Sequence, residues 1–184
     1  MYKDIIKPTL DFLIALFLLI VLSPLLLIAT IITIIDLGFP IYNRRRLREG
    51  KDKKTFVMYK LRTKTMPTKK NNYTEEYTKI SKIIDKLRIN ELPQLINVLK
   101  GDMALVGPRP FIPEEKLPDG KISPKRYMVK PGLTGMAQIH GGRAITHKEK
   151  LKYDEIYYDN ISFFTDLNII LKTLFELLFG ILDK

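Results

Sequence analysis

The residues with the clearest chemical potential are Asn90 and Glu91, an amide and a carboxylate that stand side by side between two arginines, Arg88 and Arg109. A glutamate can bind a metal ion or position a reacting group, and guanidinium groups bind phosphate oxygens through charge-assisted hydrogen bonds. A purely structural interpretation also exists, in which Asn90 caps a helix and Glu91 stabilises its first turn. We take Asn90 and Glu91 as the catalytic and metal-binding candidates and ask what surrounds them.

Two rigid loops downstream favour a reaction centre. In the first, 107–110 (GPRP), prolines on both sides of the arginine restrict its backbone. The second is 130–135 (KPGLTG), and polar residues follow it closely. Rigid loops that present polar side chains are common in binding sites. The candidates for binding phosphate or substrate are Lys60, Arg62, Arg88, Arg109, Pro110, Gln138 and Arg143.

The first element that must position these residues is a predicted strand at 55–62 (TFVMYKLR), which is rich in β-branched and aromatic residues. With 39–43 it is expected to form a small two-stranded element. Side chains alternate along a strand, so Lys60 and Arg62 are expected on one face, as a pair of cations for a phosphate.

Two helices are predicted next. The first covers 75–88, and its expected buried stripe consists of Ile80, Ile83, Ile84 and Leu87. The second begins near Asn90, because Pro93 is tolerated only in a first turn, and it ends at Gly101. Its apolar positions follow the helical spacing at Leu92, Leu95, Ile96 and Leu99.

An uncharged apolar run at 12–35 is long enough to cross about 30 Å of hydrocarbon. Ser23-Pro24 divides it, and the proline predicts a kink. Two interpretations remain: a kinked helix that spans the membrane, or a re-entrant helix that returns to the same face. Both flanks are basic, which favours both ends on the cytoplasmic side. The flanking cations are Lys3, Lys7, Arg44, Arg45, Arg46 and Arg48.

Two further segments have an interfacial character. Residues 43–54 carry seven cations against two anions, which fits either an anionic lipid surface or a solvated loop. Residues 163–182 predict an amphipathic helix that packs on a core or lies in the headgroup layer. Its apolar face comprises Phe164, Leu167, Leu171, Leu174, Phe175 and Leu178. Its polar face comprises Asp166, Lys172, Thr173 and Glu176.

Composition narrows the classes of function. The 184 residues suit one domain, and the net charge of +11 favours an anionic partner. The cations lie beside apolar segments, which favours a membrane over nucleic acid. With no cysteine and two histidines, a metal would have to be a hard cation bound by oxygen. The chain has no P-loop, no G-x-G-x-x-G fingerprint and no G-x-S-x-G elbow.

Residues 90–110 resemble the central motif of the bacterial small monotopic phosphoglycosyl transferases, D-E-L-P-Q-L-x-N-V-L-K-G-D-M-S-x-x-G-P-R-P. Asn90 stands at the first aspartate and Ala104 at the serine. Ser23-Pro24 in the apolar run also matches. The remaining matches are YKLRT at 59–63, KPGLTGMAQI at 130–139 and NISFFTDLNII at 160–170, so the resemblance covers almost the whole chain.

This resemblance implies a Mg²⁺-dependent transfer of sugar-1-phosphate from a UDP-sugar to polyprenyl (undecaprenyl) phosphate, with release of UMP. That reaction is the first membrane step of glycoconjugate assembly. In the family an aspartate attacks the β-phosphate and forms a covalent phosphosugar intermediate. The implied location is the cytoplasmic face of the bacterial inner membrane, on anionic phospholipid. A homodimer and later glycosyltransferases of the pathway are open as protein partners, and nucleic acid is not expected.

The implied fold is mainly α with a small β-hairpin, an α+β class. The resemblance places a re-entrant membrane helix at 1–36. A catalytic domain is expected at 37–184, including the interfacial helix at 163–182. The resemblance thus favours a re-entrant helix over a helix that spans the membrane.

The departures from the family motif concern the reaction itself. An amide at position 90 is a poor nucleophile and a weak Mg²⁺ ligand, so the covalent step is expected to fail. Asn90 is then either a deliberate Asp→Asn change that traps the enzyme, or a natural variant that is inactive or relies on Glu91. Segment 140–143 (HGGR) places Arg143 one residue away from the family arginine, and 61–64 reads LRTK in place of F-R-T-M. The alternative function is a non-catalytic membrane-surface protein that binds anionic lipid or nucleotide-sugar.

Overall fold

The computed structural model describes residues 1–42, 47–69, 72–113, 123–142 and 144–179. Four arginines considered above lie outside these ranges: Arg44, Arg45, Arg46 and Arg143. The described part is mostly helical with two small two-stranded sheets, which confirms the predicted α+β class.

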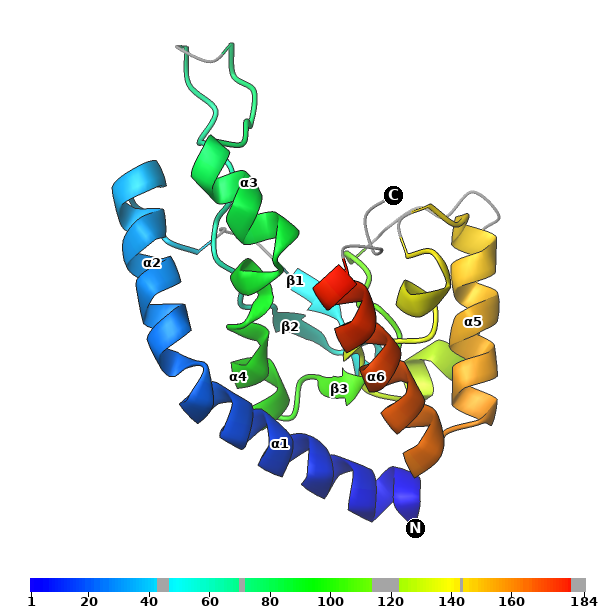
Figure 1. Cartoon of the computed structure of the whole chain (residues 1–184). Coiled ribbons are helices and arrows are strands. Elements are labelled where there is room, and N and C mark those ends of the chain that lie inside the picture. The colour runs from blue at the N-terminus through cyan, green and yellow to red at the C-terminus, as the bar shows by residue number, and fades with distance from the viewer. Residues whose placement is uncertain (43–46, 70–71, 114–122, 143, 180–184) are drawn as a thin grey trace.

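The N-terminal apolar run forms two helices that meet at a sharp bend. A π-helical turn, Tyr2–Ile6, leads into α1, Lys7–Val21, and α2 follows as Ser23–Leu37. The axes differ by 62°, so α1 runs along the base of the molecule while α2 rises beside it (Figure 1). In the described ranges no single helix is both long and apolar enough to cross a membrane, although the bent pair together has sufficient length and apolar character.

The predicted kink at Ser23-Pro24 is confirmed, and its cause lies in the hydrogen bonds of the bend. Pro24 has no N–H to donate to the carbonyl of Ile20 one turn earlier. The Ser23 hydroxyl donates to that carbonyl instead, at 2.8 Å. The bend therefore leaves this backbone acceptor satisfied.

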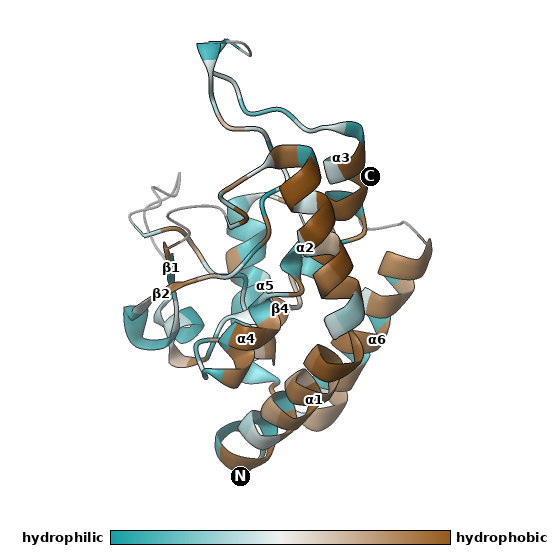
Figure 2. Cartoon of the chain, turned by 90° about the vertical axis from the view of Figure 1, so that its left-hand side faces the viewer, coloured by the Kyte–Doolittle hydropathy of each residue, from teal (hydrophilic) through white to brown (hydrophobic). Residues whose placement is uncertain are grey.

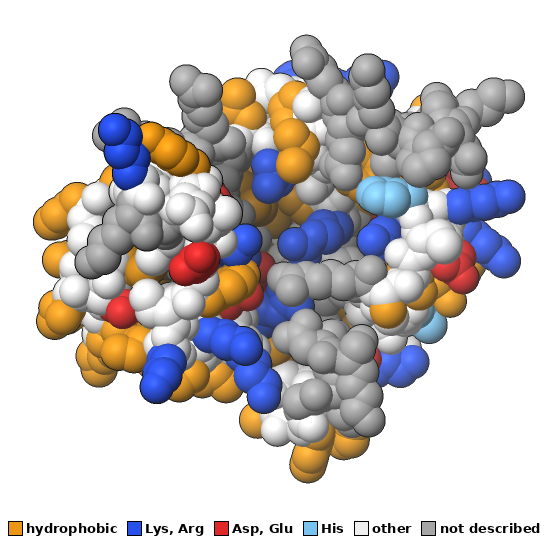
Figure 3. All heavy atoms as spheres, turned by 90° about the horizontal axis from the view of Figure 1, so that it is seen from above, with side chains coloured by type: hydrophobic (Ala, Val, Ile, Leu, Met, Phe, Trp, Pro, Cys, Tyr) orange, Lys and Arg blue, Asp and Glu red, His pale blue; other side chains and the backbone are white. Residues whose placement is uncertain are grey.

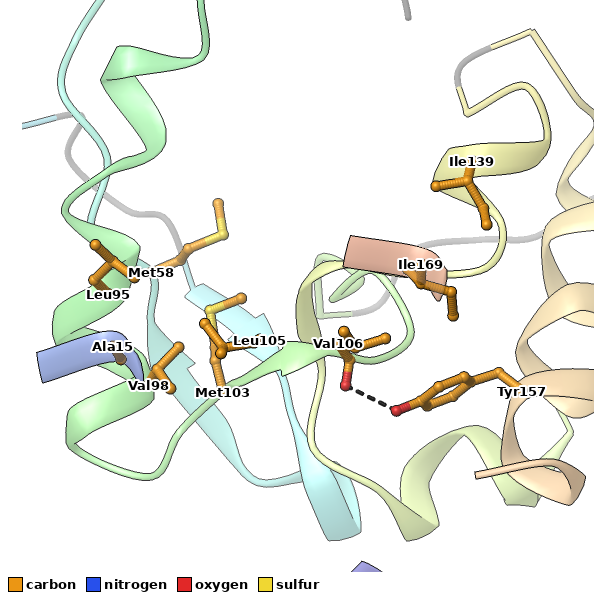
Figure 4. Packing of buried hydrophobic residues seen from close by; sticks show 10 residues of the cluster. All are labelled: Ala15, Met58, Leu95, Val98, Met103, Leu105, Val106, Ile139, Tyr157 and Ile169. Carbon is orange, nitrogen blue, oxygen red and sulfur yellow. Dashed lines mark hydrogen bonds between the residues drawn. The ribbon is translucent and has the colours of Figure 1, made fainter. Parts of the chain in front are cut away.

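Helix α1 packs on the rest of the domain. It lies against α4, Gln94–Leu99, and its Ala15 is fully buried beside Leu95 and Val98 (Figure 4). The first turn of α1 is joined to α6, Phe163–Phe179, by an ion pair between Lys7 Nζ and Asp166 Oδ2 at 2.8 Å. The bent helix pair and the C-terminal helix thus form one base.

A short parallel sheet lies above this base and was not predicted. Strand β3, Ala104–Val106, pairs with β4, Gly132–Thr134. Helix α5, His147–Asp159, covers it through Tyr157, whose hydroxyl donates to the Val106 carbonyl at 3.0 Å (Figure 4). The sheet matters because the loop 107–110 follows β3 directly, while β4 lies within 130–135, a segment that we expected to be a loop throughout.

The predicted strand at 55–62 is shorter than expected and has a different partner. Strand β2, Thr55–Val57, pairs antiparallel with β1, Leu47–Glu49, and not with 39–43. Only an isolated bridge between Tyr42 and Leu61 links the two segments that we expected to pair. Residues 58–60 are irregular, so the strict alternation assumed for Lys60 and Arg62 does not apply.

The helix predicted at 75–88 is α3, Lys79–Lys86, which begins with a capping box at Thr78. Its predicted buried stripe is wrong at three of four positions. Ile84 is buried, whereas the other three, Ile80, Ile83 and Leu87, are about half exposed. After α3 the helix expected near Asn90 starts as a 3₁₀ turn, Ile89–Glu91, before α4. The other 3₁₀ turns are Lys51–Lys53, Pro124–Met128 and Gln138–His140.

Helix α6 has the predicted amphipathic pattern, but its apolar face does not pack on the core. The six residues of this face are 39 to 79% exposed. On the polar face, Asp166 is buried beside Ile169, Thr173 and Glu176 are partly buried, and Lys172 is exposed. Hydrophobic residues also run along α1 and α2 (Figure 2). The expectation of core packing is therefore wrong, and the headgroup layer is the surviving alternative for this face.

Candidate active site

Two cavities of about 290 and 280 Å³ meet at the residues singled out in the sequence. We call the first the polar cavity; its cationic and polar lining includes Arg48, Arg88, Arg109, Arg126, His147 and Lys150. The second, the apolar cavity, is bordered by side chains that include Ile14, Leu18, Leu92, Leu95, Ile170 and Leu174. Lysines and arginines surround a hollow on the face seen from above (Figure 3).

The two cavities share a group of residues that we call the junction: Arg88, Glu91, Arg109, Leu133 and Gln138. Four of these five were predicted as catalytic or binding residues. The junction also provides charge and hydrogen-bonding groups to both cavities. A ligand in the polar cavity and a ligand in the apolar cavity would meet at the same polar groups.

Glu91 is the central carboxylate of the junction. Its Oε1 lies 2.6 Å from Lys60 Nζ and 3.5 Å from a terminal nitrogen of Arg88. Burial by itself would raise the pKa of Glu91, but the cations of Lys60, Arg109 and Arg88 outweigh it and lower the pKa to about 2. Glu91 is therefore fully ionised at neutral pH and holds Lys60 at the edge of the junction.

Arg88 reaches the junction because its backbone turns sharply between α3 and the 3₁₀ turn. Its φ of 57° and ψ of 14° place it in the left-handed region, which costs energy for a residue with a side chain. Such strain at a non-glycine residue commonly marks a functional position. The sequence identified Arg88 by its charge but gave no sign of this conformation.

Arg109 is positioned by residues that the sequence did not identify. Its carbonyl accepts a hydrogen bond from the Arg126 guanidinium, which also pairs with Asp154. The Arg126 guanidinium lies over the Phe111 ring, 3.4 Å from the ring centroid. Burial raises the pKa of Asp154 to about 6, against the pull of the nearby Arg126. Arg126 and Asp154 therefore fix the backbone of the 107–110 loop, which leaves the Arg109 side chain exposed to the cavities.

The loops 107–110 and 130–135 approach so closely that only glycine fits at their contact. A Cβ on Gly107 would collide with the Lys130 carbonyl, and one on Gly132 would collide with the Gly107 nitrogen. The Gly107 N–H donates to the Thr134 carbonyl at 2.9 Å. This contact brings Arg109 and Pro110 to the same cavity wall as Leu133 and Gln138.

Gln138 provides hydrogen-bonding capacity that the described residues do not use. Both its Oε1 and its Nε2 are buried without a partner among them. A buried polar side chain with unsatisfied groups is costly, and a bound polar ligand would remove that cost. Gln138 is thus a binding candidate on geometric grounds, whereas Arg143 lies outside the described residues.

Lys60 and Arg62, expected as a pair, have different roles in the structure. Lys60 Nζ contacts Glu91 at the junction. The Arg62 guanidinium instead donates to the carbonyls of Leu37 and Gly38 at the end of α2. Charged donors at a helix C-terminus satisfy its free carbonyls and interact favourably with its dipole. In this geometry the Arg62 guanidinium caps the C-terminus of α2, which does not fit the phosphate-binding role that we expected for it.

Asn90 is completely buried, and its side chain is hydrogen-bonded to Asp85. Its Nδ2 donates to Asp85 Oδ1 at 2.6 Å, while its Oδ1 has no partner in the described part of the chain. Asp85 was not selected from the sequence, because it falls on the helix predicted at 75–88. The available signal was that Asp85 is the only acidic residue between positions 79 and 90.

The donor set around the junction fits a magnesium ion that binds together with a substrate. Among the residues described, no cluster of three or more His, Cys, Asp or Glu side chains is present, so a cage made by the protein alone is not expected. Mg²⁺ typically uses one or two carboxylates plus substrate phosphates. Asp85, Glu91 and the unpartnered Asn90 Oδ1 are oxygen ligands of this kind.

The fold and site define a class: a mostly helical domain in which a cavity lined by cationic side chains meets an apolar cavity. The chain belongs to the bacterial sugar transferase family, whose model matches residues 2–180. It is 40% identical over 178 residues to the sugar transferase EpsL of Bacillus subtilis, covering 95% of this chain and 88% of EpsL.

Two longer relatives carry names that state a reaction. One is a UDP-glucose:undecaprenyl-phosphate glucose-1-phosphate transferase of Klebsiella pneumoniae, 34% identical over 95% of this chain and 40% of the relative. The other is a UDP-N-acetylgalactosamine-undecaprenyl-phosphate N-acetylgalactosaminephosphotransferase of Aeromonas hydrophila, 33% identical over 95% of this chain and 44% of the relative. The resemblance to phosphosugar transferases is thereby confirmed at the level of the family.

Proposed function

We propose that this chain transfers a sugar-1-phosphate from a UDP-sugar to polyprenyl phosphate and releases UMP. The observation that carries the proposal is the junction, where one polar and one apolar cavity share Arg88, Glu91 and Arg109. The reaction needs a water-soluble diphosphate donor and a long apolar acceptor to place their phosphates at one point. A cavity with several charged side chains and a second, mainly aliphatic cavity, joined at Arg88, Glu91 and Arg109, satisfy this need.

The polar cavity is the proposed site for the donor. Arg88 and Arg109 would bind the diphosphate, and Lys60 would stabilise negative charge that develops on it. Pro110 and Gln138 line the same cavity, and Gln138 offers both a donor and an acceptor. Pre-positioned cations of this type stabilise a phosphoryl-transfer transition state more than the ground state.

The apolar cavity is the proposed site for the first isoprene units of the acceptor. Residues of α1 and α6 contribute to its lining, which is mainly aliphatic away from Arg88, Glu91 and Arg109. A lipid phosphate that enters along this wall would have its chain in apolar surroundings and its head at the junction. The acceptor oxygen and the donor phosphorus would then be close enough to react.

We further propose that α1, α2 and α6 lie in the cytoplasmic leaflet of the bacterial inner membrane. The exposed apolar face of α6 and its buried Asp166 support this placement, because burial of that face in lipid would remove it from water. The 62° bend and the Lys7–Asp166 ion pair keep both arms near the catalytic domain, as a re-entrant helix requires. The anionic headgroups would face the basic surface of the protein.

Mg²⁺ is the proposed cofactor, with Glu91, Asp85 and the Asn90 amide oxygen as its protein ligands. When bound, it would neutralise charge on the diphosphate and on the UMP leaving group. Glu91 also holds Lys60, so its carboxylate organises the site even where it does not contact the ion.

The test is UMP release by the purified full chain in lipid nanodiscs, with a panel of UDP-sugars, undecaprenyl phosphate and Mg²⁺. We expect UMP and a lipid-linked sugar with at least one donor. Without the lipid we expect no lipid-linked sugar and no more than one equivalent of UMP per protein. UDP-sugar binding without UMP release, in both this chain and its Asn90→Asp variant, would instead support the non-catalytic alternative.

A further inference from the structure

We infer that Asp85, on α3, supplies the nucleophilic carboxylate that position 90 lacks. The inference rests on the proposed function, since it concerns the same transfer reaction. It starts from one contact: the side chains of positions 85 and 90 meet in a hydrogen bond of 2.6 Å. A carboxylate at position 85 therefore ends within one hydrogen bond of the side chain that carries the nucleophile elsewhere in the family.

The Asn90 side chain cannot do this work itself. An amide is a poor nucleophile, and Asn90 is completely buried. Its NH₂ group is committed to Asp85, and only a donor can occupy that position. The pair is thus complementary as it stands, since an amide at position 90 matches a carboxylate at position 85.

Glu91 is a weaker candidate because cations surround it. Lys60 and Arg88 both contact its Oε1, at 2.6 and 3.5 Å. A carboxylate paired in this way has reduced basicity and is tied to its partners. Its role in the structure is to orient the cations.

Asp85 is held mainly by neutral donors. Its Oδ1 accepts from Asn90 and, at 3.4 Å, from the Thr63 hydroxyl, and its Oδ2 accepts from Tyr77 at 3.2 Å. The nearest cation is Lys60, 3.9 Å from Oδ1. The Asp85 side chain is 17% exposed, which is comparable to the 16% of Glu91.

Lys60 connects Asp85 to the junction. Its ammonium lies between the two carboxylates, 2.6 Å from Glu91 Oε1 and 3.9 Å from Asp85 Oδ1. A β-phosphate held by Arg88 and Arg109 beside Glu91 would therefore lie close to the same ammonium that Asp85 approaches. Lys60 would neutralise the phosphate oxygens as the carboxylate approaches.

The proposed step is balanced in atoms and charge. A carboxylate oxygen of Asp85 forms a bond to the β-phosphorus of the UDP-sugar, and the bond from that phosphorus to the bridging oxygen breaks. UMP leaves with the electron pair, and an acyl phosphate links the sugar-phosphate to Asp85. An oxygen of polyprenyl phosphate then attacks the same phosphorus, which breaks the acyl phosphate bond and restores the carboxylate.

The experiment combines mass spectrometry with an exchange of the two side chains. The full chain in nanodiscs is incubated with Mg²⁺ and the UDP-sugar panel without lipid acceptor, and the adduct is mapped by peptide mass spectrometry. The variants are Asp85→Asn, Glu91→Gln, Asn90→Asp and the double exchange Asp85→Asn with Asn90→Asp. Asp159→Asn is the matched control, because Asp159 is exposed and pairs only with Lys125 among the described contacts.

We expect a phosphosugar adduct on Asp85 in the unaltered chain. Asp85→Asn should abolish it and reduce UMP release by on the order of 10³-fold, while UDP binding and thermal unfolding are retained. The double exchange should move the adduct to position 90. Asp159→Asn should behave as the unaltered chain does.

The remaining outcomes overturn the inference in distinguishable ways. An adduct on Glu91, or undiminished UMP release by Asp85→Asn, removes Asp85 from the reaction while the proposed function stands. Activity in Asn90→Asp but not in the unaltered chain does the same, and shows that Asn90 traps the enzyme. UMP release by neither the unaltered chain nor Asn90→Asp overturns both proposals.

Discussion

The base of the molecule and the junction both contain buried charges, but they balance them differently. At the base, the Asp166 carboxylate accepts from Lys7, Tyr2 and Tyr157, all at 2.8 Å, so its hydrogen-bonding capacity is used within the protein. At the junction and its edge, the three cations Lys60, Arg88 and Arg109 face two carboxylates, those of Glu91 and Asp85. The base is a closed network that stabilises the fold, whereas the junction has positive charge left for an anionic ligand.

The largest expected effect is on the base. Asp166→Ala removes the acceptor of three hydrogen bonds and leaves the buried Lys7 with only its longer ion pair to Asp11, at 3.4 Å. Loss of one partner of a buried pair costs about 3–5 kcal/mol. Thermal and denaturant unfolding should show this loss, with Asp159→Ala as the exposed control. A cost equal to that of the control would mean that the two regions do not differ as described.

The next effect depends on pH and concerns Glu91. Its pKa is lowered from 4.5 to about 2 in the folded protein, so its charge stabilises the fold above about pH 4.5. This contribution is lost as the pH falls from 4.5 towards 2, because the unfolded chain then binds the proton more readily. Glu91→Gln should be destabilised by up to about 3 kcal/mol at neutral pH. Unfolding measured at several pH values should show the difference shrinking over that window.

The control for this pH series is Glu75→Gln, at an exposed position outside both cavities. Its stability should follow that of the unaltered chain at every pH. A difference between Glu91→Gln and the unaltered chain that does not change between pH 6 and pH 3 would contradict the proposed charge environment.

Arg109→Ala is expected to have a smaller effect, in free-energy terms, and to change the rate of turnover and not the stability of the fold. Each charge-assisted hydrogen bond to phosphate contributes roughly 1.5–3 kcal/mol, so Arg109→Ala should reduce UMP release at least about tenfold. The fold should be unaffected, because the Arg109 side chain is exposed and the hydrogen bond from Arg126 is accepted by the Arg109 backbone carbonyl, which alanine retains. Lys125→Ala is the matched cationic control. Equal rates in the two variants would remove Arg109 from the site.

The smallest perturbation tests the topology of the base. The chain has no cysteine, so single cysteines at Asp4 and at Lys53 report on the N-terminus and on the catalytic domain. Both positions are exposed. With a re-entrant helix, a water-soluble maleimide should label both from the same side of sealed vesicles. Labelling from opposite sides would show that the bent pair spans the membrane.

The sequence pattern predicted correctly those parts of the fold that depend on interactions between residues near one another in the chain. The bend at Ser23-Pro24 follows from one missing N–H, and the amphipathic pattern of α6 follows from its spacing. Which face of α6 is buried did not follow, because the pattern is the same whether water or lipid lies outside. The pairing of β1 with β2, and of β3 with β4, depended on contacts between distant segments.

At the site, residue type predicted Glu91, Arg88, Arg109 and Gln138 near one another, and the structure brings them to one junction. The expected role of Arg62 failed because the backbone at 58–60 does not alternate. Arg126 and Asp154 were missed because they act on the Arg109 backbone and carry no motif of their own. Asp85 was missed because it lies five positions before Asn90, and the left-handed turn at Arg88 brings the two side chains together.

The most direct test of the central claim is the time course of UMP release with and without undecaprenyl phosphate. If the junction serves both cavities, the chain without lipid should release UMP in a single burst that does not exceed one equivalent of protein. Addition of the lipid phosphate should convert the burst into continuous turnover. Absence of UMP under both conditions, with UDP-sugar bound, would contradict the account.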